Sequence, residues 1–505
     1  MITKVFTGAV TGIDGIMVEV ESDINEGIDR FEIVGLPETS VKESKVRVLS
    51  ALRNCGYDIY NRRIAINLAP ADIRKSGTLY DLPIALSILA SAGIFPQQAL
   101  CENLFLGEIS FSGNIKPVRG TLPIAMAAKE SGCGRIFLPE QNAREAAVVN
   151  GIHVHGFRHL SELVEILSGR KEPEDFADDS DRHEEAPAID LAEVKGQEMV
   201  KRAFEITAAG AHNLLMIGPP GSGKSMLAKR IVTILPGMSY PESIETTKIY
   251  SVSGLLKRRG LITRRPFRSP HHTISDIAVV GGGTIPKPPE VSLAHNGVLF
   301  LDELPEFKRN VLEVLRQPME DKSVTISRAL TSVTYPANFM FIAAMNPCPC
   351  GYYGDRTRRC LCSPNEILRY RSRISGPLYD RIDIQIEVPP VPFRDLKKGC
   401  AGEESSAVRE RVNVAREIQT RRFGEFGIHS NAQMESRQIN GFCRIDQTGA
   451  SLLETAVEKL GLSARAYDRI LRVARTIADL DGSDGIKSVH LSEAIQYRIL
   501  DRNTI

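Results

Sequence analysis

The stretch NLLMIGPPGSGKSMLAKRI, which begins at Asn213, constrains the fold more than any other part of the chain. An apolar run leads into a glycine-rich turn, and an amphipathic segment follows it. Glycines let backbone N–H groups turn toward phosphate oxygens, and the N-terminus of a following helix adds positive potential. This order of elements predicts a parallel α/β sheet that binds a nucleotide at the loop. The predicted nucleotide-binding residues are Gly218, Pro219, Pro220, Gly221, Ser222, Gly223, Lys224 and Ser225.

A second apolar run, GVLFLDELPEF, ends in two acids and completes the predicted chemistry. Lys224 would reach the β- and γ-phosphates of ATP, and the Ser225 hydroxyl would coordinate Mg²⁺. Asp302 is expected to hold the same Mg²⁺, while Glu303 polarises the attacking water. Two adjacent acids at the end of a strand would also fit a solvated turn. Beside a phosphate-binding loop, they predict an ATPase.

Two more polar residues occupy positions that suit this site. The apolar run ANFMFIAAMN ends at Asn346, which is expected to sense the γ-phosphate and orient water. The stretch RISGPLYDRIDIQIEVP places Arg381 between two aspartates. An arginine there suits insertion into the nucleotide site of a neighbouring subunit as an arginine finger. A surface ion pair fits the same pattern.

The composition is that of an ordinary globular protein. Of 505 residues, 42% are hydrophobic and 25% are charged, which leaves room for several domains. The net charge of +1 means that nucleic-acid binding would need local basic patches. The N-terminus lacks signal-peptide features, and no apolar run approaches the roughly 20 residues that span a bilayer. We expect a cytoplasmic protein without membrane contact, in which LPIALSILASAGIF forms a buried helix.

An acidic stretch divides the chain. EPEDFADDSDRHEEAP, from Glu172 to Pro187, has eight carboxylates and almost no apolar residues, which predicts a linker over 171–188. Before it, alternating and helical segments predict an α+β domain over 1–170. After it, short buried strands alternate with helices over 189–390, as in a parallel sheet covered on both faces. A helical domain is predicted over 391–505.

Helical spacing is clear in two segments. SVKESKVRVLSALRNCG has a capping-box pattern from Ser40 to Glu43 and ends at Gly56. SARAYDRILRVARTIADLDG has an apolar face that is predicted to meet the core. The residues of that face are Ile470, Leu471, Val473, Ala474 and Ile477.

The phosphate loop, FLDE, the terminal asparagine, LYDRID and SAR occur in the order found in AAA+ ATPases. RPFRSPHHTISDIAVVGGG and PPEVSLAHNGVLFLDELPEF resemble the magnesium-chelatase-like branch, and within it the ComM/YifB family. The resemblance covers essentially the whole chain. It implies a P-loop core with a C-terminal helical lid, assembled into a homo-hexameric ring with nucleotide between subunits. It also implies that Arg381 acts in trans and that Arg465, in LSARAYDRI, is the second sensor arginine.

The N-terminal region is similar to the Lon-protease-like, S5-type α+β fold. GEISFSGNIKPVRGTLPIAMAAKESGCGRIFLPEQN resembles the second half of a Lon proteolytic domain. Leu79 stands at the nucleophile position and Leu122 at the lysine position, so the catalytic dyad is missing. Ser76 with Lys75 or Lys116 is a poor substitute for a nucleophile and its base. The resemblance therefore predicts a scaffold or binding domain rather than a peptidase.

Two basic segments are candidates for DNA contact. KRRGLITRRPFR has six basic residues and no acid, and SVTISRALTSVTYP alternates as a hairpin should. The resemblance implies that insertions at these places point into the pore of the ring, where basic loops would track phosphates. Subunit contacts or solvated faces remain alternatives. The DNA-binding candidates are Lys257, Arg258, Arg259, Arg264, Arg265, Arg268 and Arg328.

The resemblance implies ATP-driven remodelling of single-stranded or branched DNA. The leading expectation is a hexameric helicase that promotes branch migration in recombination during natural transformation, with recombination proteins as partners. One alternative is a magnesium-chelatase-type motor that drives metal insertion through a partner, although the long acidic extension of some chelatase subunits is missing here. A chaperone-like protein remodeller is another alternative.

Four of the nine cysteines gather just after Asn346, as two Cys-x-Cys pairs. Four thiolates make a complete tetrahedral shell for structural Zn²⁺, although paired zinc ligands are usually two to four residues apart. Zinc binding, reduced cysteines and redox-active disulfides all remain open. The adjacent His271 and His272 are assigned no chemistry, because their rings are expected to point in different directions. The clustered cysteines are Cys348, Cys350, Cys360 and Cys362.

Overall fold

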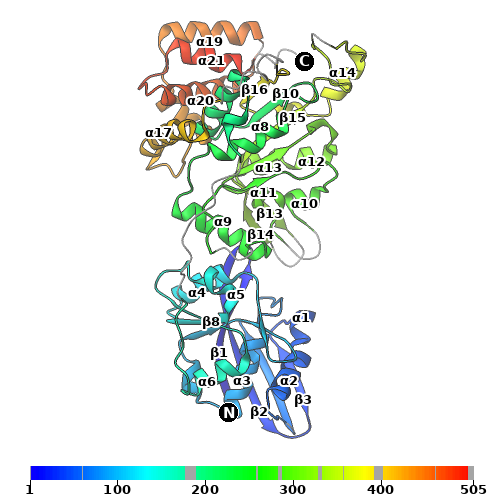
Figure 1. Ribbon diagram of the computed structural model, residues 1–505, viewed down its shortest axis with the longest axis vertical. Helices are drawn as coiled ribbons and strands as arrows, with labels where there is room; N and C mark the ends of the chain where they lie inside the picture. Colours follow the sequence, from blue (N-terminus) through cyan, green and yellow to red (C-terminus); the bar gives the residue numbers. More distant parts are fainter. Residues whose placement is uncertain are drawn as a thin grey trace. The chain divides into compact units, whose positions relative to one another are not determined.

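The computed structural model describes residues 2–59, 61–176, 189–256, 260–282, 287–327, 332–355, 358–391, 402–460 and 462–498. The chain folds into two compact units (Figure 1). The first comprises Met1–His183 together with Tyr240–Ile262, and the second comprises Glu184–Ser239 together with Thr263–Ile505. The segment 240–262 comes from the middle of the predicted ATPase domain, so the chain enters the first unit twice.

The first unit is built on a mixed seven-stranded sheet of order β3-β4-β2-β1-β5-β8-β9. β2 pairs antiparallel with β1 and β4, and the other neighbours are parallel. The strands are β1 (Ile2–Thr11), β2 (Asp14–Glu26), β3 (Arg30–Val34), β4 (Arg62–Ala69), β5 (Asn103–Phe105), β8 (Arg135–Pro139) and β9 (His153–Phe157), beside a small hairpin of β6 (Glu108–Ile109) and β7 (Ile115–Lys116). The helices are α1 (Thr39–Lys42), α2 (Ser44–Asn54), α3 (Asp81–Ser91), α4 (Thr121–Glu130), α5 (Glu140–Ala146), α6 (Leu160–Leu167) and α9 (Tyr240–Ser253).

Two helix predictions in this unit have different outcomes. The apolar run LPIALSILASAGIF forms α3, which is buried from Asp81 to Ala90, as predicted. The capping box from Ser40 to Glu43 is wrong, because the chain breaks at Glu43 into α1 and α2. The Ser40 hydroxyl instead accepts a hydrogen bond from the Gly77 N–H at 3.1 Å. The Ser40 hydroxyl therefore bonds a residue distant in the sequence rather than capping its own helix.

Helix α9 is anchored in the first unit by polar contacts as well as by packing on α4. The Ser251 carbonyl accepts a hydrogen bond from the Gly120 N–H at 3.3 Å. The Ser251 hydroxyl donates to the buried carboxylate of Glu145. Burial raises the pKa of Glu145, and the hydrogen bond from Ser251 opposes that rise. Lys248 forms an ion pair with Asp14 at 3.0 Å. Through these contacts the segment belongs structurally to the N-terminal unit.

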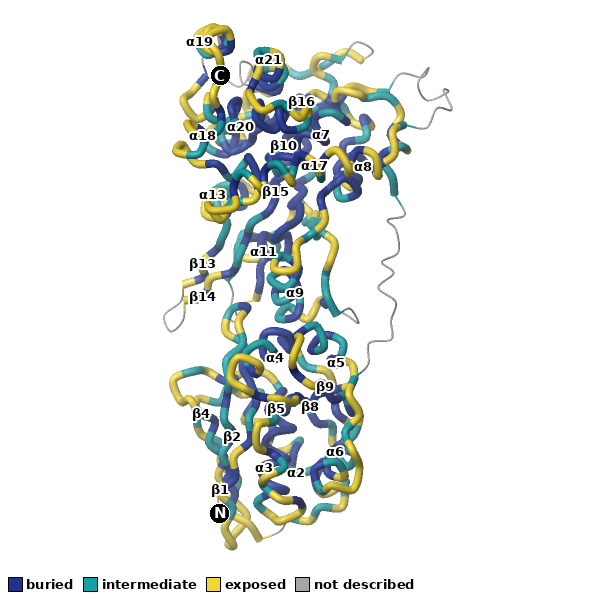
Figure 2. Tube along the Cα trace, turned by 90° about the vertical axis from the view of Figure 1, so that its left-hand side faces the viewer, coloured by how far each residue is buried: buried dark blue, intermediate teal, exposed yellow. Residues whose placement is uncertain are grey.

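The second unit contains a parallel five-stranded sheet of order β11-β12-β15-β10-β16. Its central strands are buried (Figure 2). The strands are β10 (Leu214–Ile217), β11 (Phe267–Arg268), β12 (Val298–Leu301), β15 (Met340–Met345) and β16 (Ile384–Glu387), with a separate hairpin of β13 (Ser323–Ser327) and β14 (Ser332–Pro336). The helices around the sheet are α7 (Glu198–Gly210), α8 (Lys224–Arg230), α10 (Asp276–Val280), α11 (Glu290–Leu293), α12 (Arg309–Val314), α13 (Arg316–Asp321), α14 (Pro364–Arg371) and α15 (Gly376–Tyr379).

A helical region completes the second unit. Its helices are α17 (Ser405–Phe423), α18 (Ser436–Phe442), α19 (Gln447–Leu460), α20 (Ala464–Leu480) and α21 (Ser488–Gln496). All five residues of the predicted apolar face of α20 are buried in the core, which confirms that prediction. A bilayer-spanning helix needs a long, nearly uncharged apolar stretch, and no helix in the described ranges has one.

A buried ion pair ties α20 to the sheet at the start of β16. Arg469 donates to the Asp383 carboxylate at 2.6 Å, and the backbone N–H of Asn213 donates to its other oxygen at 2.9 Å. Burial alone would raise the pKa of Asp383, but the charge of Arg469 and the neighbouring His212 lower it below the ordinary value. The helical region is thereby held to the nucleotide-binding core.

Candidate nucleotide site

The predicted phosphate loop joins the carboxyl end of β10 to the first residue of α8. Gly221 and Gly223 have φ angles of 78° and 88°, which other residue types rarely adopt. At Gly218, an added Cβ would lie 2.3 Å from the carbonyl oxygen of Val388. These three positions therefore require glycine, and the loop curves tightly enough for its N–H groups to surround an anion.

Lys224 directs its ammonium group into this loop. The Nζ atom donates to the carbonyl oxygens of Gly218 at 2.8 Å and Pro219 at 3.0 Å, and lies 3.3 Å from Oδ1 of Asn346. Burial lowers the pKa of Lys224, while the carboxylates of Asp302 and Glu303 oppose that shift. A partly desolvated cation held by exchangeable carbonyl contacts is suited to bind the phosphates of ATP.

Two acidic residues, Asp302 and Glu303, follow β12, and Asp302 lies beside the phosphate loop. The Ser225 hydroxyl donates to Oδ2 of Asp302, so these two oxygens already lie together. Hydroxyl and carboxylate oxygens are ligands that Mg²⁺ prefers, and the donor set fits this ion. Glu303 follows with a left-handed φ of 52°, and its backbone N–H donates to Asp302 at 2.9 Å. Its side chain is 58% exposed and free to face a water molecule.

Asn346 follows the last residue of β15, which pairs with β10 on one side and β12 on the other. Parallel strands place their carboxyl ends at one edge of a sheet, where α/β proteins bind their ligands. The structure thus brings the side chains of Lys224, Ser225, Asp302 and Asn346 together at this edge of the sheet.

His272 lies beside this site, where sequence reasoning assigned no role. Its Nδ1 atom is 3.6 Å from Oε2 of Glu303. The expectation that the two histidine rings diverge is wrong, because the rings of His271 and His272 are 4.1 Å apart and tilted by only 34°. The edge of His272 also meets Phe307, with ring centroids 6.4 Å apart. Sequence reasoning missed this contact because it depends on the pairing of β11 with β12. β11 ends a few residues before His272, and β12 ends just before Asp302 and Glu303.

The structure places Arg381, the predicted trans-acting finger, and Arg465, the predicted second sensor arginine, beside carboxylates of their own chain. Arg381 is 8% exposed and pairs with Glu320 at 2.5 Å, while it also donates to the Pro377 carbonyl at 2.6 Å. It lines a hollow of about 710 Å³ on the second unit. Arg465 is 67% exposed and lies 3.9 Å from Asp380, the residue before Arg381. Within one chain, both guanidinium groups therefore meet carboxylates.

The DNA-binding candidates divide into three groups. Lys257, Arg258, Arg259 and Arg328 lie outside the described residues, and Arg264 is exposed. Arg265 donates to the carbonyl oxygens of Pro236 at 2.8 Å and Asn296 at 2.8 Å. Arg268 forms a two-bond pair with Glu290, each bond 2.7 Å long. Because the guanidinium groups of Arg265 and Arg268 donate hydrogen bonds to other residues of the protein, the structure gives both arginines a structural role.

The four clustered cysteines converge in space. The sulfur of Cys348 lies 3.4 Å from that of Cys350 and 3.7 Å from that of Cys360, and Cys350 lies 3.6 Å from Cys360. All four sulfurs, including that of Cys362, lie within 4.8 Å of one another. Backbone N–H groups of Tyr352 and Leu361 lower the pKa of the Cys350 thiol to about 6. The cluster is compatible with a zinc site.

The protease dyad positions are apolar and buried in the first unit. Leu79 and Leu122 belong to its hydrophobic core. Lys75 is fully buried, and its ammonium donates to the Pro70 carbonyl, while Ser76 and Lys116 are exposed. Burial lowers the pKa of Lys75. A buried lysine directed at a carbonyl is not placed to deprotonate the exposed Ser76.

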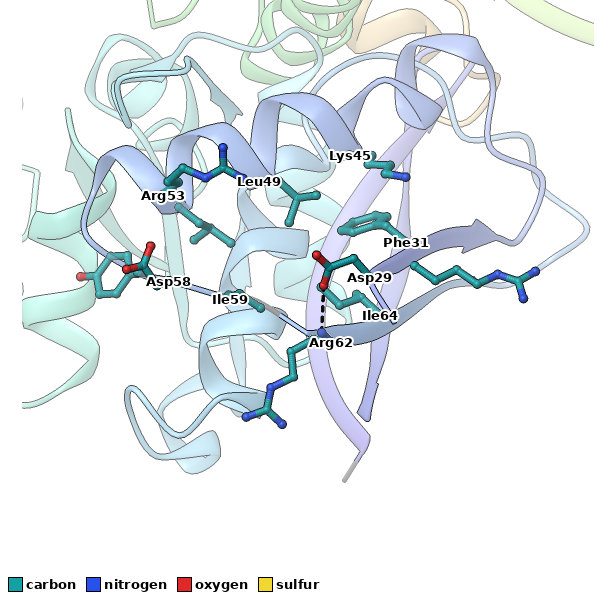
Figure 3. Close-up of a pocket in the computed structure, with 12 residues that line it drawn as sticks. Asp29, Phe31, Lys45, Leu49, Arg53, Asp58, Ile59, Arg62 and Ile64 are labelled. Carbon is teal, nitrogen blue, oxygen red and sulfur yellow. Dashed lines mark hydrogen bonds between the residues drawn. The ribbon is translucent and has the colours of Figure 1, made fainter. Parts of the chain in front are cut away.

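A small cavity in the first unit lies where α2 meets β3 and β4 (Figure 3). Its volume is about 110 Å³, which is below the roughly 300 Å³ at which small-molecule sites begin. Leu49, Ile59 and Ile64 form its apolar part, and the Arg62 N–H donates to Asp29 at 3.1 Å. Its charged rim is of mixed sign, and we assign it no chemistry.

Comparison with known proteins identifies the same architecture. Three family models match: "Magnesium chelatase, subunit ChlI" over residues 190–396, "Subunit ChlI of Mg-chelatase" over residues 20–142 and "Magnesium chelatase, subunit ChlI C-terminal" over residues 402–498. A Lon protease of Mycolicibacterium smegmatis is 25% identical over 176 residues, which are 33% of this chain and 22% of that protein. This similarity fits the Lon-related N-terminal region.

Two relatives match along nearly their whole length. The uncharacterized protein YifB of Escherichia coli is 44% identical over 504 residues, which cover 99% of this chain and 97% of that protein. Competence protein ComM of Haemophilus influenzae is 44% identical over 503 residues, with the same coverage. The AAA+ assignment suggests an ATPase that uses ATP and Mg²⁺. The chain belongs to the ComM/YifB family of magnesium-chelatase-like AAA+ proteins.

Proposed function

We propose that this chain is a cytoplasmic, ATP-driven ring motor that remodels DNA. In this proposal a homo-hexamer binds single-stranded or branched DNA and promotes branch migration in recombination during natural transformation. The observation that carries the proposal is that four side chains of the nucleotide site lie in contact, in a chain that is 44% identical to a competence protein. These side chains are Lys224, Ser225, Asp302 and Asn346. Recombination proteins are proposed as partners.

The nucleotide site supports hydrolysis by positioning and charge. Lys224 and the loop N–H groups would bind the phosphates, and Ser225 with Asp302 would hold Mg²⁺. Bound Mg²⁺ would supply charge neutralisation at the β- and γ-phosphates. Glu303 would polarise the attacking water, and Asn346 would orient it. These residues follow three neighbouring parallel strands, β10, β12 and β15, so sheet packing fixes their spacing.

A ring explains the arginines better than a single chain does. Arg381 neutralises Glu320 within its own chain, although it lines an open hollow of about 710 Å³. In an assembled ring, Arg381 of the partner subunit would leave that carboxylate for the γ-phosphate of its neighbour. Arg465, which is exposed beside Asp380, would act as the second sensor.

The proposal that DNA is the substrate rests on the similarity to a competence protein and on the two basic segments of the sequence. The β13–β14 hairpin is formed, and Arg328 follows β13 in the sequence, outside the described residues. Arg264, within the other basic segment, is exposed. Lys257, Arg258, Arg259 and Arg328 remain predicted contacts to phosphates. Contacts of this kind would be independent of base sequence and sensitive to salt.

The direct test is unwinding of a forked duplex by the purified chain. We expect ATP-dependent strand separation, and an ATPase rate that rises when single-stranded or forked DNA is added. If about six phosphates are contacted, DNA binding should weaken roughly 10³-fold between about 50 and about 200 mM salt. An ATPase rate indifferent to both kinds of DNA would contradict the proposal.

A second candidate function is a chelatase-type motor that drives metal insertion through a partner. The observation in its favour is that chelatase subunit models match all three parts of the chain. A chaperone-like remodeller of proteins would share the same motor. An ATPase rate that ignores DNA but responds to a partner protein would favour these alternatives.

His272 is proposed to position Glu303 for catalysis. Since Nδ1 of His272 is 3.6 Å from the carboxylate, a small rotation would make a hydrogen bond that fixes its orientation. We expect His272→Ala to lower kcat by about tenfold to a hundredfold with little change in KM, and His272→Gln to restore part of the loss. His271→Ala is the comparison variant, because Nδ1 of His271 contacts Thr273 at 3.0 Å and not Glu303, while its ring packs beside that of His272. Equal losses in both alanine variants would contradict a positioning role.

A further inference from the structure

We infer that Cys348, Cys350, Cys360 and Cys362 bind one Zn²⁺ ion, which holds the loop after β15 against the phosphate loop. The metal site stands on its own geometry. The second half of the inference, that the metal supports the nucleotide site, rests on the proposed function.

The sulfur positions match a metal shell. With Zn–S bonds of about 2.3 Å, the sulfurs of a tetrahedral site are about 3.8 Å apart. The recorded separations of 3.4, 3.6 and 3.7 Å are close to that edge length. They are far longer than the S–S bond of about 2.05 Å in a disulfide. Four ligands without an open position indicate a structural ion rather than a catalytic one.

The backbone around the sulfurs is folded as a ligand-holding turn. The Gly351 N–H donates to the Cys348 carbonyl at 3.0 Å, and Gly351 has a left-handed φ of 86°. The Tyr353 N–H donates to the Cys348 sulfur at 3.3 Å. N–H donors directed at thiolates are the outer-shell contacts that orient metal ligands and offset their charge.

The cysteine loop touches the nucleotide site at two points. Gly351 lies so close to the phosphate loop that an added Cβ would be 2.5 Å from Cδ of Pro220. Cys348 is two residues after Asn346, whose amide oxygen lies 3.3 Å from Nζ of Lys224. A metal that pins Cys348 and Cys350 would therefore fix both contacts.

The same loop leads directly into α14, and its last residues position the N-terminus of that helix. Cys362 immediately precedes Ser363, which caps α14 through a reciprocal capping box with Glu366. From α14, Nε of Arg371 donates to the carbonyl oxygen of Pro347, the residue after Asn346, at 3.3 Å. The cysteine cluster thus closes the loop from Cys348 to Cys362, and both ends of this loop lie near Asn346. Loss of the ion would release this end of the site, because a 15-residue loop would lose its cross-link.

The first experiment is metal analysis of the purified full chain. We expect about one zinc per chain, lost in Cys362→Ser and retained in Cys101→Ser, whose exposed thiol lies in the first unit. Replacement by Co²⁺ should give the intense visible bands of tetrahedral thiolate coordination. A chain without bound metal, one with iron in place of zinc, or equal zinc in both serine variants would overturn the zinc site. If Cys362→Ser does not fold, thiol titration of the wild-type chain should release one zinc as four thiols react.

The second experiment measures nucleotide affinity with a fluorescent ATP analogue, so it needs no turnover. Removal of the metal should weaken binding by about two- to thirtyfold. Gly351→Ala should weaken binding while the zinc stays, because its Cβ would displace Pro220. Unchanged affinity in both cases would overturn the link to the nucleotide site. Failure of the motor proposal would look different, since zinc content and nucleotide affinity would persist while DNA failed to stimulate hydrolysis.

Discussion

Glu303→Gln will slow ATP hydrolysis by about 10²- to 10⁴-fold while leaving nucleotide binding intact. Glutamine keeps the size of the side chain but cannot accept a proton from water. The Lys224 contacts to the loop carbonyls and the Ser225–Asp302 contact do not involve the Glu303 side chain, so the phosphate and magnesium positions should survive. Single-turnover hydrolysis and equilibrium binding of an ATP analogue separate the two effects.

The control for this variant is Glu306→Gln. Glu306 is another partly exposed acid in the same turn, and it forms an ion pair with Arg373 at 3.1 Å rather than facing the loop. It should retain most of the hydrolysis rate. If Glu303→Gln hydrolysed ATP as fast as Glu306→Gln does, Glu303 would not be the group that activates water.

Arg381→Ala will slow hydrolysis by about 10³-fold in the assembled protein, as expected for loss of an arginine finger. The decisive measurement is a mixture of two inactive variants. When Glu303→Gln and Arg381→Ala subunits are combined, some interfaces will join an intact Glu303 to an intact Arg381 of the partner subunit. Activity should reappear in the mixture, because the two residues would act on the same nucleotide from different chains.

A structural loss at Arg381 must be separated from a catalytic one. Arg381 is nearly buried and pairs with Glu320, so its removal also leaves that carboxylate without this partner. Glu320→Gln breaks the same ion pair but keeps the finger, and it should retain activity. A mixture of inactive variants that stays inactive, although both assemble, would show that Arg381 does not work across subunits.

The nucleotide site could be predicted from the sequence because its residues are specified locally. Gly221 and Gly223 need left-handed φ angles, and Asp302 and Asn346 each follow a fully apolar strand. Parallel strands then bring their ends together whatever the intervening loops do. The apolar face of α20 was predictable for a similar reason, since helical spacing alone determines which side chains face the core.

Other features depend on contacts between distant segments and carry no local signal. Ser40 satisfies the Gly77 N–H instead of capping a helix, and Arg268 meets Glu290 rather than solvent. His272 reaches Glu303 only because two strands are neighbours in the sheet. The placement of α9 in the first unit depends on Ser251 and Glu145, which are 106 positions apart in the chain. Sequence periodicity does not encode such pairs.

Because the chain enters the first unit twice, that unit contains residues from both sides of the acidic stretch. A protease that cut only the acidic stretch would leave two fragments that remain associated through the non-covalent contacts of α9, which is covalently part of the second fragment but packs in the first unit. A shortened chain that began after that stretch would leave the buried Ser251 hydroxyl without its Glu145 partner and would lack α4, on which α9 packs. Removal of the amino-terminal part at a single boundary therefore also removes contacts on which α9 depends.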